Sequence, residues 1–365
     1  MNSKFLSSVT FAGLLLASLM MPSAYMVQSA GPALDTAAKI EGKPLVKITG
    51  NETYPSKTKL FMTTVSAFGT PENGVPVGAV LPTIVNRDQQ ALPVRAVYPD
   101  TVTDAQVEKL NVEAMTSSQD TAAALAMELA GKKVSMDLVV SKVDTKYPSG
   151  KALKEGDVIK RIATPKTDGK LVDTPTFLSL SRLLFVTKAG AKITVEVERD
   201  GKRVTTTFAT IKAGEDSPYP PGSSLIGVGL AVKNVHYPGK VTYAVEGIGG
   251  PSAGNMFALE IYDQLTKGDL GGTKKIAGTG TANWNGLVGP IGGIEHKLVG
   301  AAREGVTDFL APALNCEDTL GYEPEGMRVW AVESTPGAIE AVKAIASGDT
   351  SKLTSCRAYV HGKAV

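Results

Sequence analysis

The chain begins with an apolar run. After Lys4 the segment FLSSVTFAGLLLASLMM holds no charged residue and extends to Pro22, which is near the short limit for a membrane-spanning helix. A cleavable signal peptide needs small residues three positions and one position before the cut, and neither Ala24 nor Ala30 ends such a site. We therefore expect residues 1–26 to be an uncleaved signal anchor, with a cleaved signal peptide as the alternative. In both cases the rest of the chain lies outside the cytoplasmic membrane.

Residues 27–131 combine strand and helix patterns. The segments PLVKITG and KLFMTTVSA carry β-branched and apolar residues between clusters of Gly, Asn and Pro, which predicts extended structure over 31–99. Thr103-Asp104 predicts a helix start, and DTAAALAMELAG predicts a second helix that ends at Gly131. We interpret this region as a lead-in layer that packs on the domains that follow.

The pattern over residues 132–212 predicts a small separate module. VSMDLVVSKV and DVIKRIA are typical of strands, and the alternating segments ITVEV and VTTTF on either side of an RDGK turn predict a hairpin. Thr174-Pro175 is expected to open a helix between them. That helix would present one apolar face, formed by Phe177, Leu180 and Leu184.

The remainder of the chain is expected to form a linker, a mixed domain and a tail. GEDSPYPPGSS lacks periodicity, so we assign residues 213–221 as a linker. Strand and helix patterns then alternate over 222–348, and the last helix opens at Thr335-Pro336, before a tail at 349–365. The order of elements predicts the α+β fold class, with this last domain of α/β type.

Composition is that of a soluble globular protein long enough for two or three domains. The formal net charge is +2 over 365 residues, and there is no basic stripe interleaved with aromatic residues. We therefore expect no nucleic-acid partner, and we expect protein or peptide partners instead.

The cysteines and histidines limit the possible covalent and metal chemistry. Cys316 and Cys356 are the only cysteines, and in an exported protein such a pair predicts a disulfide, with two buried free thiols as the alternative. The three histidines, His236, His296 and His361, are scattered and match no ligand spacing. We expect neither a metal ion nor any other cofactor.

One serine has the surroundings of a nucleophile. Ser252 stands in GGPSAG, and an apolar-periodic segment begins directly after it. Glycines allow a tight turn, and a helix N-terminus leaves backbone N–H groups free to bind an oxyanion. The sequence therefore predicts a nucleophilic Ser252 with backbone stabilisation from Gly250 and Ala253.

A serine nucleophile needs a base, and Lys297 is the candidate. Its apolar neighbours, Ile294, Leu298 and Ala301, are able to desolvate it, and desolvation lowers the pKa of a lysine. GPSAG also satisfies the G-x-S-x-G pattern of α/β-hydrolases, but that fold requires an acid and then a histidine at suitable places after the serine. His296 comes too soon and His361 is almost terminal, which favours a serine–lysine dyad.

These motifs carry a resemblance to a known family. Residues 222–345 resemble the proteolytic domain of the Lon proteases, through GPSAG at the serine and GPIGGIEHKLVGAAREGV at the lysine. By position, the resemblance implies Ser252 as nucleophile, Lys297 as general base and Thr279 as a threonine that hydrogen-bonds the lysine.

Other segments extend the resemblance. GKALKEGDVIKRI, with the helix and hairpin after it, resembles a bacterial PDZ domain, which implies a groove that adds a peptide as an extra strand. Anchor, PDZ-like module and Lon-type domain together resemble the membrane-anchored Lon-like PDZ proteins of bacterial envelopes. Lon domains also tend to assemble in rings, so a homo-oligomeric ring is an open expectation.

Two positions depart from the pattern of cytosolic Lon: residue 249 is glycine, and Thr281 stands where glutamate is common. The chain also contains no G-x-x-x-x-G-K-[ST] nucleotide-binding loop. We therefore expect an ATP-independent serine endopeptidase of the bacterial cell membrane, a single-pass protein with its catalytic part extracytoplasmic, which cleaves unfolded or flexible segments. The alternative from a different class is a Lon-like scaffold with little activity.

Overall fold

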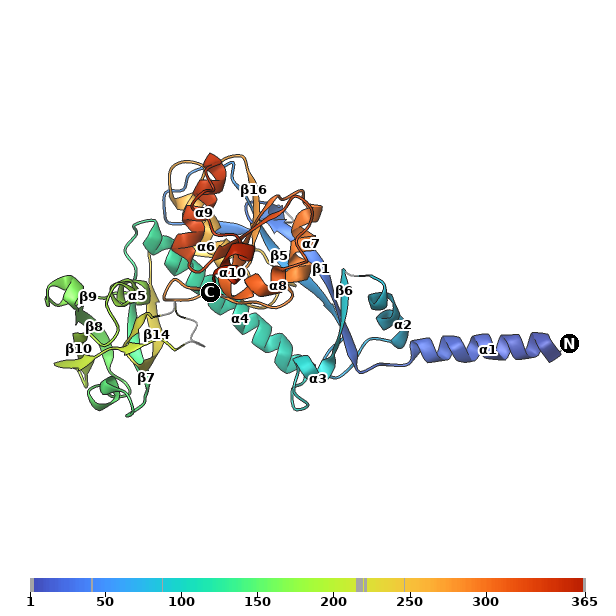
Figure 1. Ribbon diagram of the computed structural model, residues 1–365, viewed down its shortest axis with the longest axis horizontal. Coiled ribbons are helices and arrows are strands. Elements are labelled where there is room, and N and C mark those ends of the chain that lie inside the picture. Colours follow the sequence, from blue (N-terminus) through green and yellow to red (C-terminus); the bar gives the residue numbers. More distant parts are fainter. Residues whose placement is uncertain are drawn as a thin grey trace.

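The computed structural model describes residues 3–40, 42–86, 88–214, 219, 222–245 and 247–363. A domain built on a six-stranded sheet lies at the centre of the molecule, a smaller module lies at one end, and the N-terminal helix α1 (Ser3–Met20) projects from the other end (Figure 1).

The central sheet is mixed. Its strand order is β20-β19-β16-β5-β1-β6; the first four strands are parallel, and β1 pairs antiparallel with both β5 and β6. β16 is short, because its parallel pairing with β5 extends only from Lys275↔Lys59 to Gly278↔Met62. The bounds are β1 Tyr25–Asp35, β5 Lys59–Phe68, β6 Gln89–Pro93, β16 Lys275–Gly278, β19 Asp308–Pro312 and β20 Arg328–Val332.

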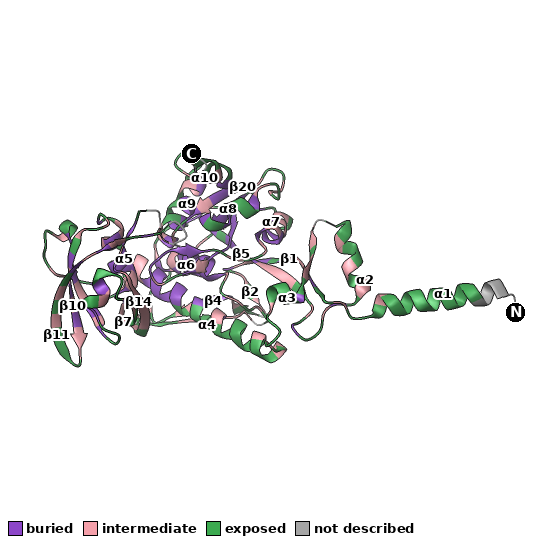
Figure 2. Cartoon of the chain, turned by 60° about the horizontal axis from the view of Figure 1, so that its bottom comes forward, coloured by how far each residue is buried: buried purple, intermediate pink, exposed green. Residues whose placement is uncertain are grey.

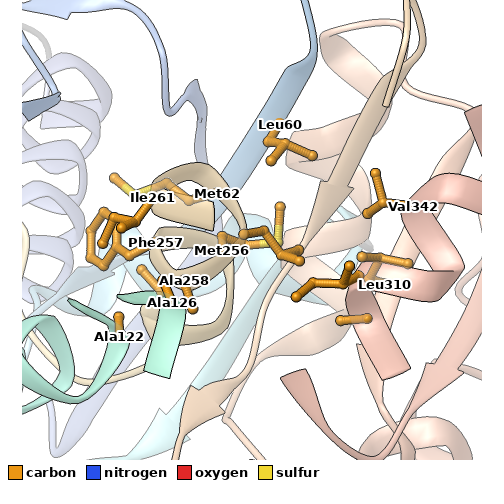
Figure 3. Close-up of a cluster of buried hydrophobic side chains, with 14 of the residues drawn as sticks. Leu60, Met62, Ala122, Ala126, Met256, Phe257, Ala258, Ile261, Leu310 and Val342 are labelled. Carbon is orange, nitrogen blue, oxygen red and sulfur yellow. The ribbon is translucent and has the colours of Figure 1, made fainter. Parts of the chain in front are cut away.

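Helices cover both faces of this sheet because alternate strand residues point to opposite sides. Leu60 and Met62 of β5 belong to the buried cluster shared with helices α6 (Gly254–Leu265) and α9 (Thr335–Ser347) (Figure 3). Phe61, between them, belongs to the cluster on the opposite face. That face is covered by α7 (Ile294–Arg303), α8 (Cys316–Thr319) and α10 (Cys356–Lys363).

One long helix, α4 (Asp104–Leu129), packs on the outer side of α6. Its alanines Ala122 and Ala126 lie against Phe257 and Ala258 in the core (Figure 3). The predicted start at Thr103 is its N-cap, with a capping box to Gln106. The prediction of two helices here was wrong, because the polar segment around residue 117 continues the helix with its exposed face.

The module contains a second sheet, with strand order β11-β10-β8-β7-β14 and β9 on β8. The helix α5 (Phe177–Phe185) begins after its N-cap Thr176, two residues later than predicted. The strand bounds are β7 Ser135–Val143, β8 Val158–Ala163, β9 Val172–Asp173, β10 Lys192–Arg199, β11 Lys202–Ala209 and β14 Val228–His236.

Two of the predicted domain boundaries do not describe this architecture. β14 was assigned to the domain at 222–348, but it pairs with β7 and so extends the module beyond residue 212. The region 27–131 is not a separate layer, because its strands β1, β5 and β6 complete the central sheet. The module is therefore inserted into the sheet domain, between α4 and the segment that leads to Ser252. Residues 215–218 and 220–221 of the predicted linker lie outside the described residues.

Short elements complete the fold. β12 (Ile211–Lys212) pairs with β13 (Ser224–Leu225), β4 (Val46–Thr49) with β15 (Lys240–Tyr243), β17 (Thr281–Ala282) with β18 (Val288–Gly289), and β2 (Lys39–Ile40) with β3 (Lys43–Pro44). The remaining helical turns are α2 (Val77–Val80), α3 (Val94–Val97), η1 (Leu81–Ile84), η2 (Pro148–Lys151), η3 (Pro165–Thr167) and η4 (Ala313–Asn315).

The N-terminal segment differs from the expected anchor over 1–26. The helix α1 ends at Met20, and strand β1 begins at Tyr25. Exposed residues run along α1 (Figure 2), and they include Phe11, Leu14 and Leu16. Among the helices of the described chain, none is both long enough and apolar enough to cross a membrane.

The two cysteines lie on the face of the sheet that α7 covers. The structure joins Cys316 of α8 and Cys356 of α10 by a disulfide, with their Cα atoms 4.7 Å apart. Both cysteines are buried in the cluster that contains Phe309 and Val329. The predicted tail over 349–365 therefore contains a helix that is linked covalently to the sheet domain.

Candidate active site

Ser252 lies at the edge of a groove, two residues before α6 begins. The groove has a volume of about 580 Å³ and is lined by the C-terminal half of β5, by the loop at 247–249 and by Gly292. Ser252 is half-buried, so its hydroxyl group is accessible from the groove.

Lys297 reaches Ser252 from the other face of the sheet. It lies in the first turn of α7, its side chain is only 2% exposed, and its Nζ donates hydrogen bonds to Ser252 Oγ at 2.8 Å and to Thr279 Oγ1 at 2.9 Å. Its helix neighbours Ile294 and Leu298 belong to the buried cluster on the face of the sheet that α7 covers. The predicted serine–lysine pair is thus within hydrogen-bonding distance.

Thr279 follows β16 directly and is fully buried. Its Oγ1 donates its proton to the carbonyl oxygen of Ser252 at 3.1 Å, so towards Lys297 it serves as an acceptor. When Lys297 is neutral, Nζ donates to Thr279 and keeps its lone pair for the hydroxyl proton of Ser252. Thr279 therefore orients the amine of Lys297 through the hydrogen bond between the two side chains.

Burial has a large effect on the protonation of Lys297. Desolvation lowers the pKa of its ammonium group from 10.5 to about 7. Close to half of the molecules would then hold a neutral amine at neutral pH, whereas an exposed lysine is almost entirely protonated there. A lysine in this position can take a proton from a hydroxyl group under physiological conditions.

The two predicted oxyanion groups differ in availability. The N–H of Gly250 donates to the carbonyl of Asn111 at 3.1 Å, and the N–H groups of Gly254 and Asn255 are also used within the fold. Gly250 is therefore not free to bind an oxyanion in this arrangement. Ala253 is the N-cap of α6, and its N–H has no hydrogen-bond partner among the described residues.

No histidine of the described chain hydrogen-bonds Ser252. His236 and His361 are exposed. His296 is 2% exposed, and its Nε2 lies 3.8 Å from Glu295 Oε1 without a hydrogen-bond partner in the described structure. The geometry gives no support to the histidine-based hydrolase.

Two features near the serine were not predicted. Asn111 and Ser118 of α4 hydrogen-bond the loop before Ser252, through Gly250 and Pro251. In addition, β5 lines the groove along an edge that β16 leaves unpaired. The glycines around Ser252 indicated a close backbone approach, but the sequence holds no signal that identifies its partners.

Comparison with known proteins identifies part of the chain. Residues 234–330 match the family model for the Lon protease (S16) C-terminal proteolytic domain. This range contains Ser252, Thr279 and Lys297, and it lies within the region 222–345 that was expected to resemble that domain. The prediction is confirmed for this part of the chain.

Curated relatives agree over the same part. The chain is 40% identical over 79 residues to the Lon protease of Clostridioides difficile (strain 630) and 37% identical over 79 residues to Lon protease 1 of Bacillus subtilis (strain 168). Each alignment covers 22% of this chain and 10% of the relative. The chain therefore spans about a tenth of the length of the curated relatives it matches.

A solved structure also aligns with about a quarter of the chain. It is the PDZ domain of the SdrC-like protein from Listeria monocytogenes, with 18% identity, a TM-score of 0.21, and coverage of 26% of this chain and 85% of that one. A TM-score this low does not establish a shared fold.

The buried lysine predicts a gain in stability on substitution. Because the pKa of Lys297 is lower in the folded chain than the ordinary 10.5, unfolding takes up a proton between pH 7 and 10.5, and stability rises with pH over that window. Lys297→Met removes the free-energy cost of burying an ionisable lysine. We therefore expect the free energy of unfolding to rise by a few kcal/mol at pH 7. The gain should shrink towards pH 10.

Denaturant titrations of both proteins at pH 6.5, 8 and 9.5 measure this difference. Lys343→Met is the matched control, because Lys343 is an exposed lysine on α9. A Lys297→Met variant that is no more stable than wild type at pH 6.5 would show that Lys297 is not desolvated in the folded protein.

Proposed function

We propose that the chain is an ATP-independent serine endopeptidase in which Ser252 is the nucleophile and Lys297 the general base. The observation that carries the proposal is the 2.8 Å contact between Lys297 Nζ and Ser252 Oγ, made by a lysine whose burial lowers its pKa to about 7. The match of residues 234–330 to the Lon proteolytic domain supports the same reaction class.

The contacts define a reaction sequence. Ser252 Oγ attacks the carbonyl carbon of the scissile peptide bond while its proton passes to the neutral Lys297 Nζ. The negative charge on the carbonyl oxygen is stabilised by backbone N–H groups, with Ala253 as the donor that the fold leaves available. Lys297 then returns the proton to the leaving amine, and the acyl group stays on Ser252. Water, deprotonated by the same lysine, releases it and restores the hydroxyl.

The groove is suited to an extended peptide. β5 pairs with β1 on one side up to Phe68, but its pairing with β16 on the other side ends at Met62. Residues 63–68 therefore have an edge that no other strand of the described structure covers, and all of them line the groove of Ser252. A peptide that adds to this edge uses backbone hydrogen bonds, which requires an unfolded or flexible segment.

The module supplies a second candidate peptide site. A cavity of about 500 Å³ lies between α5 and residues 224–230, with Phe177, Leu184 and Leu230 among its lining residues. β14 is the terminal strand of its sheet, so a peptide added beside it would lie in this cavity. This arrangement supports the PDZ-like role expected from the sequence, which is to select or deliver a chain end.

The expected location at the bacterial cell membrane, with an extracytoplasmic catalytic part, is also a proposal. It is supported by the apolar residues that α1 exposes, among them Phe11, Leu14 and Leu16. An exposed apolar helix of this kind favours contact with lipid over water.

The dyad predicts a set of activities. With a fluorescently labelled disordered protein such as casein as substrate, Ser252→Ala and Lys297→Arg should each lose about 1,000-fold or more in kcat, and the double variant should be scarcely worse. The arginine keeps a charge but cannot release its proton. Wild-type activity should rise with pH through about 7, because only neutral Lys297 accepts the serine proton.

His296→Ala is the control for a neighbouring buried side chain. It should keep most activity, since Nε2 of its imidazole has no hydrogen-bond partner in the described structure. Circular dichroism confirms that each variant is folded. Full activity of Lys297→Arg together with loss of activity in His296→Ala would replace the dyad with a histidine-based mechanism.

The module predicts a difference between long and short substrates. Leu230→Glu places a charge in the cavity beside α5, so the KM for a disordered protein should rise about tenfold, the effect of about 1.4 kcal/mol of lost binding. Cleavage of an eight-residue peptide should not change. Val232→Glu, on the same strand but outside that cavity, is the matched control. Equal KM values for both variants and wild type would show that the module does not bind the substrate.

The N-terminal segment predicts membrane association. The full chain, expressed in a bacterium with a signal-recognising export system, should sediment with membranes, and protease added outside the cytoplasmic membrane should digest it. N-terminal sequencing should show that the segment before Tyr25 is retained. A product that begins near Tyr25 or Gly31 and stays in the soluble external fraction would contradict the anchor.

A further inference from the structure

The serine loop, residues 249–253, is held by α4. The N–H of Gly250 donates to the carbonyl of Asn111 at 3.1 Å, and the hydroxyl group of Ser118 donates to the carbonyl of Pro251 at 2.9 Å. The contact is close, because a Cβ atom added at Gly254 would lie 2.4 Å from Ser118 Oγ. At this contact α4 and the first residue of α6 therefore fit together only with small residues at positions 118 and 254.

Ser118 is unusual for a residue in the middle of a helix. Its side chain is 4% exposed, and serine in a helix interior commonly returns its hydroxyl proton to the carbonyl four residues before it. Ser118 donates to Pro251, a residue 133 positions away along the chain. Alanine would serve helix formation and close packing better. The hydroxyl group of Ser118 therefore acts on the serine loop through its hydrogen bond to Pro251.

The hydrogen bond fixes the plane of one peptide group beside Ser252. A trans peptide is planar, and its N–H points opposite to its C=O. Ser118 holds the carbonyl of Pro251 and so sets the direction of the N–H of Ser252. Thr279 Oγ1 and the N–H of Gly280 hold the carbonyl of Ser252, at 3.1 and 2.8 Å, and so set the direction of the N–H of Ala253.

The two planes on either side of Ser252 are therefore fixed by different elements. β16 and the residues after it fix the plane that follows the serine, and α4 fixes the plane that precedes it. Together they determine where the Cα–Cβ bond of Ser252 points. Lys297 Nζ, 2.8 Å from Ser252 Oγ, lies in that direction.

We propose that Ser118 is a positioning residue for Ser252: its hydroxyl group holds the Pro251–Ser252 peptide so that Oγ faces both Lys297 and the substrate carbonyl. The inference rests on the proposed peptidase function. It predicts that loss of the Ser118 hydroxyl lowers the rate of the chemical step and leaves substrate binding intact, because Ser118 itself does not line the groove.

Five forms of the full chain test this role: wild type, Ser118→Ala, Ser118→Cys, Ser117→Ala and Ser252→Ala. Ser117→Ala is the matched control, since Ser117 is an exposed serine next to Ser118 on the same helix. Cysteine at position 118 fills the space of serine but is a weak hydrogen-bond donor. For each form we would measure kcat and KM on labelled casein, the melting temperature, and inhibition by a peptide boronate, whose boron forms a tetrahedral adduct with a serine Oγ.

We expect Ser118→Ala and Ser118→Cys to lower kcat about 10- to 100-fold, the effect of a misplacement of about 1 Å. KM should stay within about twofold of wild type, and the inhibition constant of the boronate should rise by a factor similar to the fall in kcat/KM. Ser117→Ala should match wild type. If Ser118→Ala does not fold, the cysteine variant alone gives these readings.

A kcat within about twofold of wild type in either Ser118 variant would overturn the positioning role while leaving the peptidase intact. This covers full recovery by cysteine, a rise in KM with unchanged kcat, and a fall in melting temperature alone, which would assign Ser118 to stability. A wild-type chain no more active than Ser252→Ala is a separate outcome, in which the proposed function itself fails.

Discussion

The site depends on keeping one lysine out of water. Lys297 enters from one face of the central sheet and Ser252 from the other, and they meet beyond the carboxyl end of β16. An ammonium group at this position would lose most of its hydration, which is why its pKa falls to about 7. Its two hydrogen-bond partners, Ser252 and Thr279, are both hydroxyl groups. No carboxylate is among these contacts, so burial is the cause of the lowered pKa of Lys297.

Local sequence was sufficient to single out Ser252 and Lys297, which lie within hydrogen-bonding distance, but not the contacts that hold Ser252 in place. Ser252 and Lys297 were predicted because their signals are local: glycines before a helix in one case and apolar neighbours in the other. The strand β14 was correctly predicted as a strand but assigned to the wrong sheet, since its apolar alternation fits either one. The contact of Ser118 with Pro251 spans 133 positions of the chain, and no periodicity encodes such a pair.

Because the module is inserted into the sheet domain, two segments connect it to the serine loop. On the entry side, α4 hydrogen-bonds that loop through Asn111 and Ser118. Its far end contacts α5, where Glu128 Oε1 accepts from Thr176 Oγ1 at 2.9 Å. On the exit side, β14 continues through β15 into the loop itself. A peptide bound between α5 and β14 would thus touch β14 directly and α4 only through α5. Figure 1 shows α4 and β14 as the two connections between the module and the sheet domain.

The end of β16 explains why Lys297 and the open edge of β5 lie in the same place. The chain turns away from β5 at Gly280. This residue has a φ of +131°, which favours glycine, and a Cβ atom added here would lie 2.5 Å from Val288 Cγ1. Both features exclude other residues at this position. Pairing with β5 stops there, so residues 63–68 keep an open edge. The same turn brings Thr279 under Lys297 and the N–H of Gly280 to the carbonyl of Ser252. Had β16 continued along β5, it would have covered the edge at residues 63–68 and carried Thr279 away from Lys297. The short strand is therefore a condition for both the open edge and the contact between Thr279 and Lys297.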